Sequence, residues 1–282
     1  MASGAPLAAL GGMKRILLFS LLFAVPLFAQ QSDNVILPLE YNYQLLIPVA
    51  GNTPGANGTF FKSDINIINL RAAEQRIRLR WLPQGRTGVD IPAKEMTIAA
   101  ASGFFSEDFV ANVMDQTGLG AIQIVGIRSD GQPDVDARLY ATSRIWTPHP
   151  VAGGTVSQTF PTLTMTTRSD APPKWIFGVR RDDRYRLNVG IVNYSGIKQS
   201  FTVQTGSGGP VPGGETVLIQ VEPFSIVQAG ITGQAQGAFQ IIVRNDSGSA
   251  LWDAWASSID NVTGDAWSEI AFNIPAGTNT TP

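Results

Sequence analysis

Hydrophobic and polar residues alternate most clearly over residues 76–82. Ile77, Leu79 and Trp81 fall on one face of an extended chain, and three arginines fall on the other. A period of two is typical of a β-strand with one buried and one solvated face. Shorter apolar runs of the same kind predict further strands over residues 35–39, 44–49, 64–70, 96–100, 121–125 and 137–146. This part of the chain is therefore expected to be mainly β.

One segment in this part has helical character instead. Residues 106–114 read SEDFVANVM. Ser106 is a favourable N-cap residue, and Glu107 and Asp108 suit the positive end of a helix. We therefore expect one short helix here.

The second part of the chain repeats the order of the first. The segment SDINIINL, which ends in Asn69-Leu70, has its counterpart in LNVGIVNY, which ends in Asn193-Tyr194. Three more pairs follow in the same order: KEMTI with GETVL, GAIQI with GAFQI, and YATS with WASS. The spacing between partners shrinks slowly, as expected when a duplicated domain loses a few loop residues. The pattern predicts strands over residues 174–179, 186–193, 199–204, 216–221, 226–229, 238–244, 250–259 and 267–272.

The expected fold is all-β, with two tandem antiparallel Ig-like β-sandwich domains from an internal duplication and one short helix in the first. Short strands joined by Gly- and Pro-rich turns favour this architecture. Pro38 matches Pro161, which places the start of the second domain near Ser157. The predicted division is a signal peptide (1–29), domain 1 (33–147), a Pro/Gly linker (148–156), domain 2 (157–275) and a disordered tail (276–282).

The N-terminal residues have the pattern of a signal peptide. Lys14 and Arg15 precede an apolar run over residues 16–28, and Ala29 is the expected cleavage residue. No other segment has the roughly 20 apolar residues that a membrane-spanning helix needs. We therefore expect an exported protein with no membrane span in the mature chain, located outside the cell, at its surface or in the periplasm.

The composition excludes several kinds of chemistry. The chain has no cysteine, which removes disulfides, thiolate metal sites and a cysteine nucleophile. His149 is the only histidine. A Ser-His-Asp triad would have to use this residue, and a multi-histidine metal site lacks the histidines it needs. The formal net charge of −2 argues against general nucleic-acid binding.

The order of motifs resembles a group of secreted bacterial proteins. The segment GANGTFFKSDINIINL, then ATSRIWT, and finally SSIDNVTGDA carry this resemblance, which covers nearly all of the mature chain. These proteins are mostly uncharacterised and contain paired Ig-like β-sandwich repeats. The resemblance implies the fold and export, and it implies no activity.

Carboxylate side chains are the remaining candidates for catalysis or metal binding. Glycoside hydrolysis needs two of them across a cleft. The candidates are Asp108, Asp115, Asp134, Asp136, Asp253 and Asp265. Nearly all stand in turn sequences, where Asp is favoured because its side chain bonds to the backbone. Asp260 and Asp265 are a weak calcium candidate, because their loop lacks the EF-hand spacing and also suits a tight turn.

Aromatic residues and arginines are the candidates for binding. Trp252 and Trp255 differ by three positions and are expected to point to opposite faces of one strand, which leaves Trp252 or Trp267 as an exposed anchor for a sugar ring. Arg76, Arg78 and Arg80 form a basic stripe that suits an anionic partner or a solvated sheet face.

These features predict a noncatalytic protein with no cofactor. Its expected role is that of a structural, adhesion or surface-interaction module whose partner is a surface protein or a polysaccharide. One alternative is a polysaccharide-binding module that uses an exposed tryptophan. A carboxylate-based glycoside hydrolase is the more distant alternative.

Overall fold

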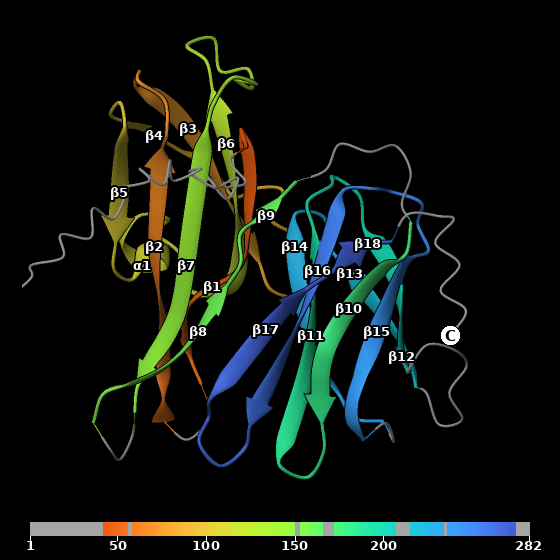
Figure 1. Ribbon diagram of the computed structural model, residues 1–282. Coiled ribbons are helices and arrows are strands. Elements are labelled where there is room, and N and C mark those ends of the chain that lie inside the picture. Colours follow the sequence, from red (N-terminus) through yellow and green to blue (C-terminus); the bar gives the residue numbers. More distant parts are fainter. Residues whose placement is uncertain are drawn as a thin grey trace, which may run out of the picture. The chain divides into compact units, whose positions relative to one another are not determined.

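The computed structural model describes residues 42–55, 58–149, 153–165, 172–206, 215–233 and 236–274, which all belong to one compact unit. These residues form eighteen strands and one short helix (Figure 1). The named strands pair only in antiparallel fashion, so the expected all-β class is confirmed. The predicted signal peptide, the strand over residues 35–39 and the tail lie outside the described residues.

The first nine strands, here called the first half, form one nine-stranded sheet. Its order is β4-β3-β6-β1-β2-β7-β8, with β5 on β2 and β9 on β1. Strand β1 pairs with β6 along most of its length and reaches β2 only through Thr53 and Pro54. The elements are β1 (Gln44–Pro54), β2 (Phe60–Asn69), β3 (Gln75–Pro83), β4 (Lys94–Ile98), β5 (Ser102–Ser106), α1 (Phe109–Asn112), β6 (Gly118–Ile127), β7 (Leu139–Pro148), β8 (Thr155–Phe160) and β9 (Leu163–Thr164).

The last nine strands, here called the second half, form two sheets. One has the order β13-β12-β15-β10-β18, and the other has the order β14-β11-β16-β17. The strands are β10 (Lys174–Arg181), β11 (Tyr185–Asn193), β12 (Gln199–Gly206), β13 (Thr216–Val221), β14 (Ser225–Ile231), β15 (Gly237–Asn245), β16 (Trp252–Asp260), β17 (Ala266–Ile270) and β18 (Phe272–Asn273).

The strand orders of the two halves correspond. In the first half, β4-β3-β6-β1-β9 has the same order as β13-β12-β15-β10-β18 in the second, and β5-β2-β7-β8 has the same order as β14-β11-β16-β17. The first strand of each half is also irregular at the same point, between Ile47 and Ala50 in β1 and between Ile176 and Val179 in β10.

Each half has its own apolar core. Alternation along β3 places Ile77, Leu79 and Trp81 inside the first core, as the sequence predicts. The second core includes Phe201 and Trp252, whose rings lie 5.1 Å apart. Burial of such side chains is the main driving force for folding a chain that has no disulfide.

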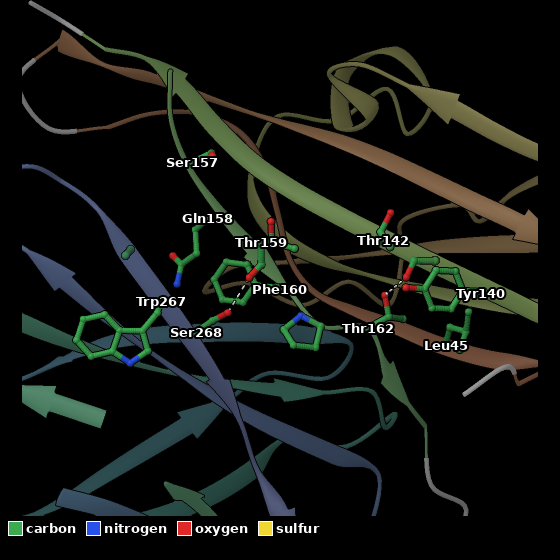
Figure 2. Close-up of a pocket in the computed structure, with 13 residues that line it drawn as sticks. Leu45, Tyr140, Thr142, Ser157, Gln158, Thr159, Phe160, Thr162, Trp267 and Ser268 are labelled. Carbon is green, nitrogen blue, oxygen red and sulfur yellow. Dashed lines mark hydrogen bonds between the residues drawn. The ribbon is translucent and has the colours of Figure 1, made fainter. Parts of the chain in front are cut away.

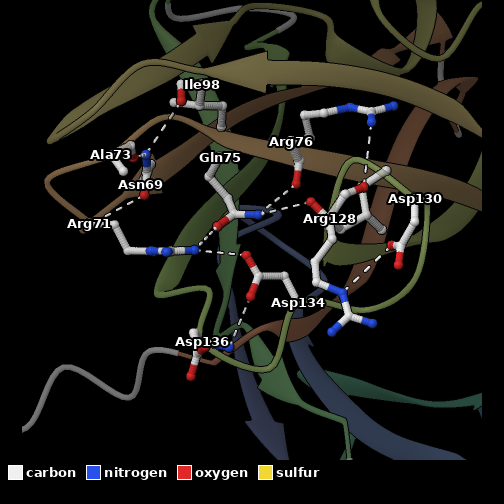
Figure 3. A network of polar contacts seen from close by, with 11 residues as sticks. Asn69, Arg71, Ala73, Gln75, Arg76, Ile98, Arg128, Asp130, Asp134 and Asp136 are labelled. Atoms are coloured by element: carbon white, nitrogen blue, oxygen red, sulfur yellow. Dashed lines mark hydrogen bonds and ion pairs between the residues drawn. The ribbon is translucent and has the colours of Figure 1, made fainter.

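The two matching asparagines close the same kind of turn. The Asn69 amide donates to the carbonyl oxygens of Ala73, Ile98 and Ala99 at 2.7–3.3 Å (Figure 3). The Asn193 amide likewise donates to three carbonyl oxygens, at 2.7–3.2 Å, from residues Ile197, Val221 and Glu222. Both asparagines are fully buried, so these hydrogen bonds satisfy amide groups that water cannot reach.

A third apolar cluster joins the two halves. It includes Leu46 and Phe160 from the first half and Ile226 and Trp255 from the second. Polar contacts reinforce it, because the Ser225 hydroxyl donates to the carbonyl oxygen of Pro83 at 2.8 Å. The halves are therefore packed against each other through a shared core.

Two features differ from the sequence-based expectation. Ser157, predicted to start domain 2, lies in β8, which pairs with β7, and the following strand β9 pairs with β1. Strand pairing therefore places residues 155–164 in the first half. The predicted helix over residues 106–114 is only the four-residue α1, and its N-cap is Asp108 instead of Ser106, which ends β5.

Among the described residues, no helix has the length and apolar character of a membrane span.

Candidate functional site

A groove of about 620 Å³ lies where β8 of the first half meets β17 of the second. Figure 2 shows Trp267 and Ser268 on one side of it and Tyr140 and Thr142 on the other, with Phe160 between them. The lining residues are Leu45, Tyr140, Ala141, Thr142, Ser157, Gln158, Thr159, Phe160, Pro161, Thr162, Ala266, Trp267 and Ser268.

Hydrogen bonds between the halves hold the walls of this groove. The Ser268 hydroxyl donates to the carbonyl oxygen of Thr159 at 2.7 Å (Figure 2). The Gln158 amide donates to the Ser257 hydroxyl at 2.7 Å. The ring of Phe160 packs edge-on against that of Trp255, with their centroids 5.0 Å apart. The groove is therefore a composite of both halves, held by polar and aromatic contacts.

The chemistry of the lining is neutral. The described residues of the groove include five hydroxyl-bearing Ser and Thr side chains, one amide and three aromatic rings, and none of them is Asp, Glu, His, Lys or Arg. Such a lining offers hydrogen bonds and apolar faces and no group with a pKa suited to general acid–base catalysis near neutral pH. It suits binding of an uncharged, hydroxyl-rich ligand.

Trp267, a predicted anchor, lies at the rim of the groove and is partly buried. Its indole nitrogen donates to the carbonyl oxygen of Gly178 at 3.1 Å. Its ring meets Tyr185 edge-to-face, with centroids 5.5 Å apart. These two contacts fix the indole in one orientation beside the groove, which lowers the entropic cost of using it as a binding surface.

Trp252, the other predicted anchor, is fully buried, and this corrects the expectation that it is exposed. It and Trp255 do lie in different clusters, the second core and the core between the halves, as their spacing predicts. Trp255 is buried as well, because the outer face of β16 meets the first half and not solvent. Neither side chain can stack on a ligand at the surface.

An ion pair lies beside Trp252. The Lys174 ammonium is 2.5 Å from a carboxylate oxygen of Asp253, donates to the carbonyl oxygen of Trp252 at 3.0 Å and lies 4.8 Å from the centroid of its ring. Both charged side chains are buried. Burial raises the pKa of Asp253, and the charge of Lys174 opposes that rise. Because Asp253 already has an internal partner, it is not a free catalytic carboxylate.

The three arginines of β3 have partners within the protein. Arg76 and Arg78 both pair with Glu95 of β4, at 2.9 and 2.8 Å. The guanidinium of Arg80 lies 4.2 Å from the centroid of the Phe224 ring in the second half. This stripe therefore consists of paired surface charges and one contact between the halves, and these contacts account for its arginines without a ligand.

The Asp260 carboxylate is saturated, which argues against the calcium hypothesis. One oxygen accepts from the Arg184 guanidinium at 2.7 and 2.8 Å, and the other accepts from the backbone N–H of Val262 at 2.7 Å. The hydrogen bonds from Arg184 hold the pKa of Asp260 below its usual range. Asp265 joins the same turn through its backbone, since its carbonyl accepts from the N–H of Asp260. The described residues contain no cluster of three or more metal-ligating side chains.

Other carboxylates that the sequence offered for catalysis are also engaged. Asp134 pairs with Arg71 at 2.7 Å and accepts from the backbone N–H of Asp136 (Figure 3). Asp108 accepts from the Asn52 amide at 2.8 Å and lies 3.3 Å from the ammonium of Lys62. These contacts assign the carboxylates of Asp134 and Asp108 to turns and ion pairs, in agreement with the structural alternative.

Sequence reasoning missed a set of aromatic side chains in the second half, two of them exposed and one half-buried. We name Trp175, Phe177 and Phe272 the outer aromatic surface. The rings of Trp175 and Phe177 are nearly parallel, with an interplanar angle of 8° and centroids 6.2 Å apart. Phe272 on β18 is the register partner of Trp175. The sequence contained a pattern that could have identified them. An apolar Ile176 between two aromatic residues predicts a buried Ile176 and two aromatic side chains that point outward.

Comparison of the chain with models of known protein families finds no match, and comparison with curated proteins finds none either.

Proposed function

We propose that the protein is a noncatalytic, exported module of two tandem Ig-like β-sandwiches, derived from an internal duplication, that binds a neutral polysaccharide. The corresponding strand orders of the two halves and the matching turns at Asn69 and Asn193 support the duplication. The predicted signal peptide supports export. The role that follows is attachment to a polysaccharide at a surface, in keeping with an adhesion or scaffold module that needs no cofactor.

The observation that carries the binding proposal is the uncharged groove between β8 and β17. An oligosaccharide presents hydroxyl groups at its edges and apolar C–H faces, which match the hydroxyl groups of Thr142 and Ser157 and the rings of Tyr140 and Trp267. The volume of the groove, about 620 Å³, lies within the usual range for ligand pockets. The neutral lining also favours binding over hydrolysis, because hydrolysis needs two carboxyl groups at the sugar.

A glycan array tests this function. The mature chain from Gln30 is applied to neutral and anionic glycans together with the Trp267→Ala variant. We expect selective retention on neutral glycans and a loss of at least about tenfold in affinity for the variant. An array without any bound glycan contradicts the proposal and shifts the search to protein partners.

A second variant guards against a folding defect in Trp267→Ala. Thr142 is exposed at the groove, so Thr142→Trp fills the site while removing no core packing. Thr216→Trp places the same ring at an exposed position on the edge strand β13 and serves as the matched control. The proposal requires that Thr142→Trp abolish binding and that Thr216→Trp leave it unchanged.

A further inference from the structure

The outer aromatic surface exposes large apolar side chains to solvent. Phe177 is 41% exposed and Phe272 is 50% exposed, although both belong to strands. Cross-strand partners point to the same side of a sheet, so Trp175 and Phe272 share one face. Exposed aromatic side chains gathered on one face mark binding sites more often than isolated ones do.

This surface adjoins the rim of the groove. The Trp267 indole, which lines the groove, donates to the carbonyl oxygen of Gly178, and Gly178 directly follows Phe177 in β10. On the other side, β17 and β18 are separated by a single residue, so Trp267 and Phe272 lie on one short segment. Trp267 is therefore linked to the outer aromatic surface through its contact with β10 and through the segment that joins β17 to β18.

The charged side chains near Trp267 and β10 bear on the kind of ligand that can bind there. Glu269 lies next to Gly178, with its carboxylate 3.5 Å from the position that a Cβ of residue 178 would take. The Glu269 carboxylate can accept hydrogen bonds from the hydroxyl groups of a neutral polymer. The nearby guanidinium groups of Arg180 and Arg184, which lie over the Tyr185 ring, are paired with Asp182 and Asp260. The chemistry therefore fits a neutral polysaccharide at both places.

We propose that the outer aromatic surface is a second binding site for the same neutral polysaccharide, so that the protein binds a long polymer more tightly than a short oligosaccharide. This inference rests on the proposed function of the groove. A chain that occupies both sites gains affinity because its second contact is intramolecular. A trisaccharide can occupy only the groove and gains nothing from Phe177 or Phe272.

The test compares polymer and trisaccharide for three proteins. The wild-type chain, Phe177→Ser/Phe272→Ser and the control Leu218→Ser are bound to cellulose, chitin, starch and curdlan, and to the trisaccharide of each. Leu218 is 77% exposed on β13, at the opposite edge of the same sheet, so its substitution removes a similar surface group without touching the site. We expect the double variant to lose about tenfold or more in affinity for the polymer and to bind the trisaccharide normally.

Several outcomes would overturn the inference. One is equal affinity of the wild-type chain for polymer and trisaccharide, and another is polymer binding that the double variant leaves unchanged. A wild-type dimer that the double variant dissociates, with no change in polymer binding, would assign the surface to a second copy of the chain. Trisaccharide binding that depends on Trp267 keeps the proposed function in each of these cases, whereas absence of any glycan binding removes both proposals.

Discussion

Gly190 lies directly beneath the indole ring of Trp255, its register partner across β11 and β16. A Cβ at position 190 would lie 2.0 Å from Cε2 of that ring, which no side chain can occupy without a shift. Trp255 belongs to the cluster between the halves, so the absence of a side chain at position 190 makes room for that shared core.

Gly190→Ala is therefore expected to destabilise the protein by about 2–3 kcal/mol, since overpacking forces the ring out of place. Urea unfolding measures this difference. Gly196→Ala is the matched control, because a Cβ there would meet only Phe224, at an ordinary 3.8 Å. Equal stability of the two variants would show that the ring of Trp255 moves freely.

Removal of Lys174 should show how much an unpaired buried carboxylate lowers the free energy of unfolding. Lys174→Met leaves Asp253 buried without its cation, so we expect a loss of about 3–5 kcal/mol at pH 7. Replacing both residues, as in Lys174→Met/Asp253→Ala, should recover most of that loss. Chemical denaturation of the two variants at pH 7 compares them, and a double variant as unstable as the single one would contradict the explanation.

The same variant should show a characteristic pH dependence. Burial raises the pKa of Asp253, and without Lys174 only the backbone hydrogen bond at Ala254 still opposes that rise. A carboxyl group with a raised pKa in the folded state is most favourable when protonated, below its ordinary pKa of about 3.9, and loses stability as the pH rises. The stability deficit of Lys174→Met should thus be smaller at pH 4 than at pH 7. A deficit that does not change with pH would mean that Asp253 remains ionised throughout.

Asn193→Ala should destabilise the protein by about 2–3 kcal/mol, because it removes three hydrogen bonds from a buried amide and leaves the buried carbonyl group of Val221 without this donor. Asn69→Ala should have an effect of similar direction, since the Asn69 amide also donates to three carbonyl oxygens. The shared core predicts one cooperative unfolding transition for both variants, which calorimetry can detect. Asn273→Ala, at an exposed position, is the control and should change stability by less than about 0.5 kcal/mol.

Asp260 should stabilise the fold through Arg184 and not through calcium. Its pKa is lowered in the folded state, so its contribution is present above its ordinary pKa of about 3.9 and is lost as the pH falls through the lower, folded-state value. Asp260→Asn should therefore be less stable than the wild-type chain at pH 7, and the difference should shrink in acid. Thermal unfolding with millimolar calcium should show no rise in Tm, and a clear rise would restore the calcium hypothesis.

The sequence pattern predicted those features that depend on a single strand. Alternation along residues 76–82 identified β3 and its buried face, because the period of side chains is a property of the strand itself. The matching segments around Asn69 and Asn193 pointed to two positions with equivalent hydrogen bonds, since a buried amide and its turn are local features.

Features that depend on tertiary pairing were not predicted. The residues of β8 do not specify their partner, so its pairing with β7 could not be seen from the segment alone. Similarly, nothing local distinguishes buried Trp252 from partly exposed Trp267. Their difference arises because β16 is covered on both faces, whereas β17 lies at the edge of its sheet. Residues of both halves line the groove, so the sequence of one half alone does not predict it.

The late strands β9 and β18 have a consequence for folding kinetics. Leu45 pairs with Thr164, and Trp175 pairs with Phe272, so the first strand of each half finds one of its partners only at the end of that half. Loop closure over such long separations must precede the energetic gain, and folds dominated by nonlocal pairs therefore fold slowly, in milliseconds to seconds. During synthesis, the edge of β1 next to β9 stays open until residue 164 is available. A chain that forms its contacts in this order remains unfolded for longer, and the proposed export through a secretion channel would require that state.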